Sequence, residues 1–134
     1  MANVLYNMFK EKLLTAGLDV EADNIKVILS DAADYTFNSA HDFLDDVTAP
    51  ARVATSGNLA SKTIVSGVFD SADFTWTAVS GDQSEQIIMY DDTPGTEATK
   101  NLIVFYDTSI TGMPVTPNGG NINVTVHASG WFSL

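Results

Sequence analysis

Apolar and polar residues alternate along several stretches in the second half of this 134-residue chain. Near the end, Ile122, Val124 and Val126 fall on one face of a predicted strand, and the polar residues between them fall on the other. Turn-forming Gly, Pro, Ser and Asn residues separate this strand from five others. The pattern therefore predicts strands over residues 52–54, 62–69, 74–79, 86–90, 102–106 and 122–128.

Two of these segments, 87–90 and 102–106, are apolar without interruption. Strands of this kind are usually buried on both faces. The loop between them contains Thr93-Pro94-Gly95, which is typical of a turn. We therefore expect the two strands to pair as the central hairpin of the sheet, with a buried core at Met89, Val104 and Phe105.

The start of the chain has the spacing of a helix. Leu5, Phe9 and Leu13 recur at every fourth position, which predicts a helix over residues 4–16. Asn3 is suited to cap its first turn, and Gly17 is suited to end it.

Between this helix and residue 50 the pattern predicts a strand and a short second helix. Ile25, Val27 and Leu29 alternate with polar or smaller neighbours, as in a strand. Residues 39–47 are suited to a helix capped by Ser39, with Phe43 and Leu44 facing inward. The whole predicts one domain, residues 1–134, of the mainly-β (α+β) class: an antiparallel β-sandwich or barrel-like sheet with one N-terminal helix.

Composition narrows the possible partners. Six Lys and Arg oppose 17 Asp and Glu, for a formal net charge of −11. Such a surface repels nucleic acid and anionic membranes, so we expect neither as a partner. Lys10, Glu11 and Lys12 interrupt the first apolar segment, and no run approaches the roughly 20 apolar residues of a membrane span. We therefore expect a soluble protein that is made in the cytoplasm without a targeting segment.

The residues show no pattern typical of an enzyme. Cysteine is absent, and no Ser lies between glycines in the Gly-x-Ser-x-Gly arrangement of a hydrolase. The two histidines, His41 and His127, are expected to be surface or hydrogen-bonded residues rather than catalytic bases. We accordingly expect no enzymatic activity and no cofactor.

Acidic residues resemble a calcium loop in only one place. Asp19, Glu21 and Asp23 alternate like the start of an EF-hand, but Asn24 replaces the required glycine and Ser30 replaces the final glutamate. We therefore expect solvated carboxylates and no metal site.

Aromatic residues allow two interpretations. Trp76 and Trp131, with Phe74 and Phe132, are candidates either for the protein core or for an exposed platform that binds sugar rings. Phe74 and Trp76 share one face of a predicted strand, which favours the core.

The order of short motifs along the chain carries a resemblance. The motifs are Leu5-Tyr6-Asn7, Asp23-x-Ile25-Lys26-Val27, Tyr35-Thr36-Phe37, Ala51-Arg52-Val53-Ala54, Gly67-Val68-Phe69-Asp70 and Pro117-Asn118-Gly119-Gly120. In this order they resemble a family of small proteins encoded in the structural-gene regions of tailed bacteriophages. The resemblance implies a virion component: a decoration (cement) protein that binds and reinforces the outside of the head shell. The alternative is a tail or head-fibre module that binds a host-surface glycan.

A decoration protein would have two kinds of partner. The resemblance implies the major capsid protein and further copies of the chain itself, with a trimer favoured over a dimer because three capsid subunits meet at local threefold positions. Trp131, Phe132 and Leu134 are our candidates for this contact, since aromatic residues anchor interfaces well. The other interpretation is that these three residues complete the core of the protomer.

Overall fold

The computed structural model describes residues 3–108 and 110–134. This part of the chain contains one α-helix, α1 (Asn7–Leu14), and 3₁₀ helices at Leu44–Asp46, Ala49–Ala51 and Glu97–Thr99. Strand makes up 31% of the chain and helix 13%, and the sheets are antiparallel, so the predicted mainly-β (α+β) class with one helix is confirmed. The strands are β1 (Val4–Leu5), β2 (Ile25–Ser30), β3 (Arg52–Thr55), β4 (Thr63–Val65), β5 (Val68–Asp70), β6 (Phe74–Trp76), β7 (Gln86–Asp91), β8 (Leu102–Tyr106), β9 (Ile122–Val124) and β10 (Phe132–Ser133).

The largest sheet has five antiparallel strands in the order β1-β8-β7-β2-β3. Its middle contains the predicted hairpin, in which Ile88 of β7 lies opposite Phe105 of β8. Met89, Val104 and Phe105 are at most 2% exposed, which confirms them as core. Uninterrupted apolar sequence in β7 and β8 thus identifies the two strands that other elements cover on both faces.

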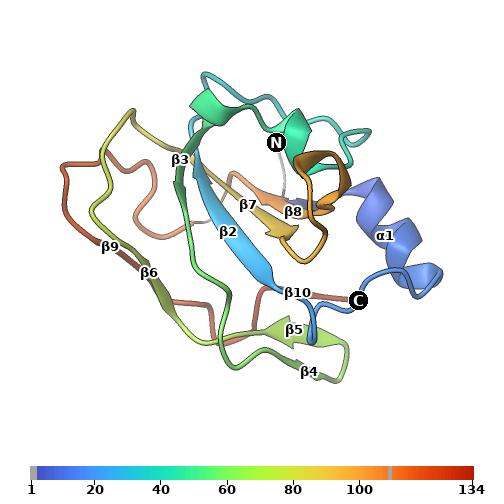
Figure 1. Cartoon of the computed structure of the whole chain (residues 1–134). Helices are drawn as coiled ribbons and strands as arrows, with labels where there is room; N and C mark the ends of the chain where they lie inside the picture. The colour runs from blue at the N-terminus through green and yellow to red at the C-terminus, as the bar shows by residue number, and fades with distance from the viewer. Residues whose placement is uncertain (1–2, 109) are drawn as a thin grey trace.

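Different elements pack on the two faces of this sheet. On one face, the ring of Phe105 lies 4.9 Å from that of Phe37 and 6.1 Å from that of Tyr35. On the other face two small sheets pack, one of β6 and β9 and one in the order β10-β5-β4. The indole of Trp76 in β6 donates a 3.1 Å hydrogen bond to the carbonyl of Val27, which ties the first small sheet to β2. Figure 1 shows β6 and β9 to the left of the large sheet and β4, β5 and β10 below it.

The first helix is shorter than predicted. Val4 and Leu5 pair with β8 as strand β1, so α1 begins only at Asn7, and Asn3 does not cap it. The sheet competes successfully for these residues because β8 offers them backbone partners that a helix end would lack. At the other end, Ala16 has the left-handed backbone conformation (φ 54°) that we expected of Gly17.

The predicted helix over residues 39–47 is wrong. Only Leu44–Asp46 is helical, as one 3₁₀ turn, and Ser39 is not its cap. The backbone here is held by the start of β8 instead, through hydrogen bonds from Leu44 N–H to the Lys100 carbonyl and from Leu102 N–H to the Asp42 carbonyl, both 2.9 Å. Leu44 is nevertheless buried, as the sequence pattern indicated.

The predicted strand over residues 62–69 is a hairpin. Ser66 (φ 52°) and Gly67 (φ 78°) form the reversal between β4 and β5, since both have the positive φ that a tight hairpin turn requires. The strands predicted over 74–79 and 122–128 are real but end earlier, at Trp76 and Val124.

Candidate functional site

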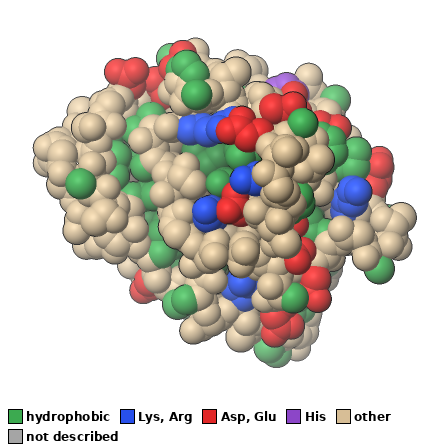
Figure 2. Space-filling model, viewed as in Figure 1, with side chains coloured by type: hydrophobic (Ala, Val, Ile, Leu, Met, Phe, Trp, Pro, Cys, Tyr) green, Lys and Arg blue, Asp and Glu red, His purple; other side chains and the backbone are tan. Residues whose placement is uncertain are grey.

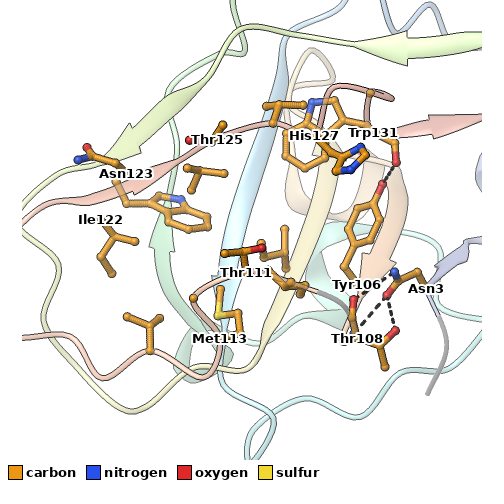
Figure 3. A pocket seen from close by; sticks show the side chains of 18 of the residues that line it. Asn3, Tyr106, Thr108, Thr111, Met113, Ile122, Asn123, Thr125, His127 and Trp131 are labelled. Atoms are coloured by element: carbon orange, nitrogen blue, oxygen red, sulfur yellow. Dashed lines mark hydrogen bonds between the residues drawn. The ribbon is translucent and has the colours of Figure 1, made fainter.

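A groove of about 710 Å³ opens on the side of the molecule that carries β9. Trp76 and Ile87 lie at its floor, and the stretch from Ile122 to Ala128 forms one wall. The opposite wall is the loop after β8, from Ile110 to Val115. Figure 3 shows the side chains of these segments converging on the same space.

Asn3 holds the loop wall of this groove in place. Its side-chain oxygen accepts hydrogen bonds from the backbone N–H groups of Asp107 and Thr108, at 3.2 and 3.3 Å, and from the Thr108 hydroxyl at 3.1 Å. Its amide nitrogen donates to the Thr108 carbonyl at 3.2 Å. The residue that we expected to cap a helix therefore joins the start of the chain to the segment that follows β8, beside the groove (Figure 3).

Trp131 closes one end of the groove and is itself fixed on several sides. Its indole N–H donates to the Ser71 hydroxyl at 2.8 Å, and its carbonyl accepts a hydrogen bond from the Tyr106 hydroxyl. The ring of Phe74 stacks on it, with centroids 6.2 Å apart and planes 24° apart. Burial raises the pKa of Tyr106, so this hydroxyl remains a donor at any physiological pH.

The aromatic residues that were candidates for a sugar-binding platform therefore lie largely in the core. Trp76 is 1% exposed, and Phe132 packs between the rings of Phe9 and Phe69 at 5.6 and 5.4 Å. One face of Trp131 is occupied by Phe74. A sugar ring needs an open aromatic face, and these residues use their faces on one another.

The structure separates the three candidate interface residues. Trp131 and Phe132 are half-buried against the core of the protomer, whereas the side chain of Leu134 is 74% exposed. An interface role for them remains a prediction, and Leu134 is the residue whose side chain is free to make it.

Leu134 belongs to a surface with other exposed apolar side chains. Together with Leu14 it lines a shallow hollow of about 270 Å³ between α1 and the end of the chain. Its N–H donates to the carbonyl of Gly67 at the β4–β5 turn, so β4 lies nearby. We call Leu13, Leu14 and Leu134, which line this hollow together with Lys10, the C-terminal apolar surface; Figure 1 shows the C-terminus between α1 and the β4–β5 hairpin.

Both histidines have partners that belong to the fold. The Nδ1 atom of His41 lies 2.9 Å from the Tyr35 hydroxyl, which in turn lies 2.8 Å from the buried Tyr6 hydroxyl. Burial raises the pKa of Tyr35 to about 12, so it does not ionise near neutral pH. His127 lies on the exposed rim of the groove, where its Nδ1 accepts the N–H of Ser129 at 3.0 Å.

Two carboxylates of the segment that resembles a calcium loop accept hydrogen bonds from the backbone. Asp19 accepts the N–H groups of Glu21 and Ala22, both at 3.1 Å, and Asp23 accepts the N–H of Asp19 at 3.0 Å. Elsewhere in the described residues, Asp31, Asp34 and Asp82 can bring carboxylate oxygens within 4.8 Å of one another. Asp34 and Asp82 are exposed, and water solvates such groups without a metal ion.

Half of the basic residues are held by carboxylates. Asp92 lies 2.8 Å from Lys26 and 2.7 Å from Lys100, and Arg52 lies 2.8 Å from Glu97. Partial burial disfavours the charge of Asp92, but hydrogen bonds from Lys100 and Lys26 outweigh it and lower the pKa of that carboxyl. Figure 2 shows basic side chains beside acidic ones near the middle of the viewed face. These three basic residues lie far apart in the sequence, and the fold places each of them beside a carboxylate.

The groove is the feature that sequence patterns missed. Its loop wall contains Ile110, Met113 and Val115 within a segment rich in Gly, Pro and Thr, where apolar residues have no strand or helix to bury them. Apolar residues in such a loop were the available signal, because a loop usually runs over the surface.

No protein-family model matches this chain, and no curated protein matches it. None of the helices in the described part of the chain has the length and apolar character needed to cross a lipid bilayer.

Proposed function

We propose that this chain is a structural protein of a tailed-phage virion that decorates the outer surface of the head shell. It acts without catalysis, as a homo-oligomer that binds the major capsid protein. A trimer is the form we favour, because it matches the local threefold positions of an icosahedral shell.

The C-terminal apolar surface is the observation that carries this proposal. Leu14 is 88% exposed and Leu134 74%, in a chain whose other large apolar side chains are mostly buried. Apolar side chains gathered on one surface are typical of a protein–protein contact. The hollow between Leu14 and Leu134 offers a place for one apolar side chain of a partner.

Charge supports the same role. With a net charge of −11 the chain is repelled by nucleic acid, which suits a position on the outside of a shell that contains DNA. The same charge makes copies repel one another at long range. Association therefore requires a surface without acidic residues, and the hollow at the C-terminal apolar surface is lined by Lys10, Leu13, Leu14 and Leu134.

Mass spectrometry of purified virions tests the role directly. A decoration protein occupies every equivalent position on the shell, so we expect on the order of hundreds of copies per particle. A copy number in the range of a single vertex or tail structure would contradict decoration and favour the glycan-binding appendage.

Surface variants test the contact. Leu14→Asp and Leu134→Asp should leave the fold intact and weaken sedimentation with empty shells by about tenfold or more, because each places a carboxylate in an apolar contact. Thr125→Asp, an exposed change on the far β9 ribbon, is the matched control and should bind as the wild type does.

Deleting residues 130–134 distinguishes the two interpretations of the chain end. We expect this truncation to destabilise the protomer, because it removes Trp131 and Phe132 together with Leu134. If the truncated protein instead folds and binds shells with undiminished affinity, the C-terminal residues are not part of the contact.

A further inference from the structure

Strand β9 has an open edge. In the described residues it pairs only with β6, in a sheet of two strands. All residues from Ile122 to Ala128 line the groove, both those with half-buried side chains and those with exposed ones. Side chains on the two faces of a strand can line one groove only if the groove runs along the edge of that strand.

The backbone polarity of this edge follows from one hydrogen bond. The N–H of Val126 donates to the side chain of Asp73 at 2.8 Å, and Asp73 immediately precedes β6. Backbone groups of successive residues in an extended chain point to opposite sides. The N–H and C=O groups of Asn123 and Thr125 therefore point away from β6, toward the groove.

The side chains that line the groove disfavour a highly charged ligand. None of the residues that line the groove is Asp, Glu, Lys or Arg, although the chain carries 23 such residues. Ile, Val and Met supply seven of the lining residues, and Asn, Thr, Tyr and His supply another seven. Trp131 has one ring face covered by Phe74, as described above. An extended peptide uses both the apolar side chains of this lining and the backbone groups along the edge of β9.

We propose that the groove binds an extended peptide segment, which adds a strand to the open edge of β9. Its backbone pairs with Asn123 and Thr125, and every second side chain is apolar and enters the groove between β9 and residues 110–115. About five residues of such a segment match the length from Asn123 to His127. The segment is neutral or basic, because the surrounding protein carries a charge of −11.

Selection from a displayed library of random peptides of about twelve residues tests this inference on the full chain. We expect enrichment of sequences in which apolar residues alternate with polar or basic ones. An enriched synthetic peptide should slow hydrogen exchange at the backbone amides of Asn123 and Thr125, since these become donors in the added strand.

Two variants with matched controls locate the binding. Thr125→Pro removes the edge N–H, and Ile110→Glu places a charge on the loop wall; each should weaken the peptide by about tenfold or more. Thr125→Val keeps the N–H, and Ile64→Glu changes an exposed position of β4 that does not line the groove, so both should bind as the wild type does. Circular dichroism confirms that each variant is folded.

Three results would overturn the inference: no enriched peptide, peptide binding that Thr125→Pro and Ile110→Glu leave unchanged, or groove resonances that shift with a panel of neutral oligosaccharides and not with peptides. The inference is independent of capsid decoration, because it uses a different surface. Leu134→Asp should weaken shell binding by about tenfold or more without changing peptide affinity, so failure of one proposal is distinguishable from failure of the other.

Discussion

The hydroxyl groups of Tyr6 and Tyr35 lie 2.8 Å apart in the protein interior, although 29 residues separate them along the chain. Tyr35 bonds at the same time to Nδ1 of His41 at 2.9 Å. Burial raises the pKa of both tyrosines, so the pair remains neutral and hydrogen-bonded across the physiological range. This chain of three side chains joins the segment before α1 to the loop that covers the large sheet.

Replacing the two tyrosines should have unequal effects. Tyr6→Phe removes one hydrogen bond and should lower the free energy of unfolding by about 1 kcal/mol. Tyr35→Phe removes both bonds and leaves the Tyr6 hydroxyl buried without this partner, so we expect a loss of about 2–3 kcal/mol. The double variant should lose less than the sum, because the two residues share one bond. Urea unfolding measures all three; a smaller loss for Tyr35→Phe than for Tyr6→Phe would contradict this arrangement.

The core of the large sheet depends on Phe105. Phe105→Ala should lower the free energy of unfolding by about 3–5 kcal/mol, since the side chain is fully buried and contacts the rings of Phe37 and Tyr35. Chemical denaturation measures the loss. Val65→Ala, at a position 67% exposed, is the control and should change stability by less than about 0.5 kcal/mol. A loss below about 1 kcal/mol for Phe105→Ala would show that β8 is not central.

Gly130 is required where the chain approaches β5. It has a φ of +79°, and an added Cβ would lie 2.6 Å from the Phe69 carbonyl oxygen. Gly130→Ala should therefore cost about 3 kcal/mol or more. Gly119 has a similar φ of +87°, but an added Cβ would meet nothing within 4 Å. Gly119→Ala should cost only the conformational penalty of about 1–2 kcal/mol. Equal midpoints of thermal unfolding for the two variants would refute the close approach.

The ion pairs of Asp92 predict a pH-dependent stability. The pKa of Asp92 is lowered in the folded state, so its contribution is present above the ordinary carboxyl range and is lost as the pH falls through the folded pKa. Asp92→Asn should therefore be less stable than the wild type by about 1–2 kcal/mol at neutral pH, and the difference should vanish once the pH has fallen well below the ordinary carboxyl range. Burial raises the pKa of the neighbouring Asp91, which acts in the opposite direction but does so in both proteins. Denaturant titrations across this pH range measure the difference; a gap that persists unchanged in acid would contradict the ion-pair origin.

Much of the candidate site lay outside the reach of sequence patterns. Trp131 and Leu134 were both identified as contact candidates, but nothing in the order of residues distinguishes the fixed indole from the exposed leucine. That difference arises because the chain end pairs with β5, a strand more than 60 residues earlier. The groove likewise needs the start of the chain to meet the loop after β8, through the hydrogen bonds of Asn3 with Asp107 and Thr108.

The sequence by itself determined those strands whose burial can be inferred from the pattern of apolar and polar residues. Uninterrupted apolar runs specified β7 and β8, and strict alternation specified one half-buried and one exposed face from Ile122 to His127, because side-chain burial follows local periodicity. Tertiary structure decided where the elements begin and end. Val4 and Leu5 form strand β1 instead of the first turn of the predicted helix, and residues in the segment 39–47 bond to the start of β8 instead of forming a helix. At such positions local preferences differ by a fraction of a kcal/mol, and a backbone partner from a distant strand outweighs them.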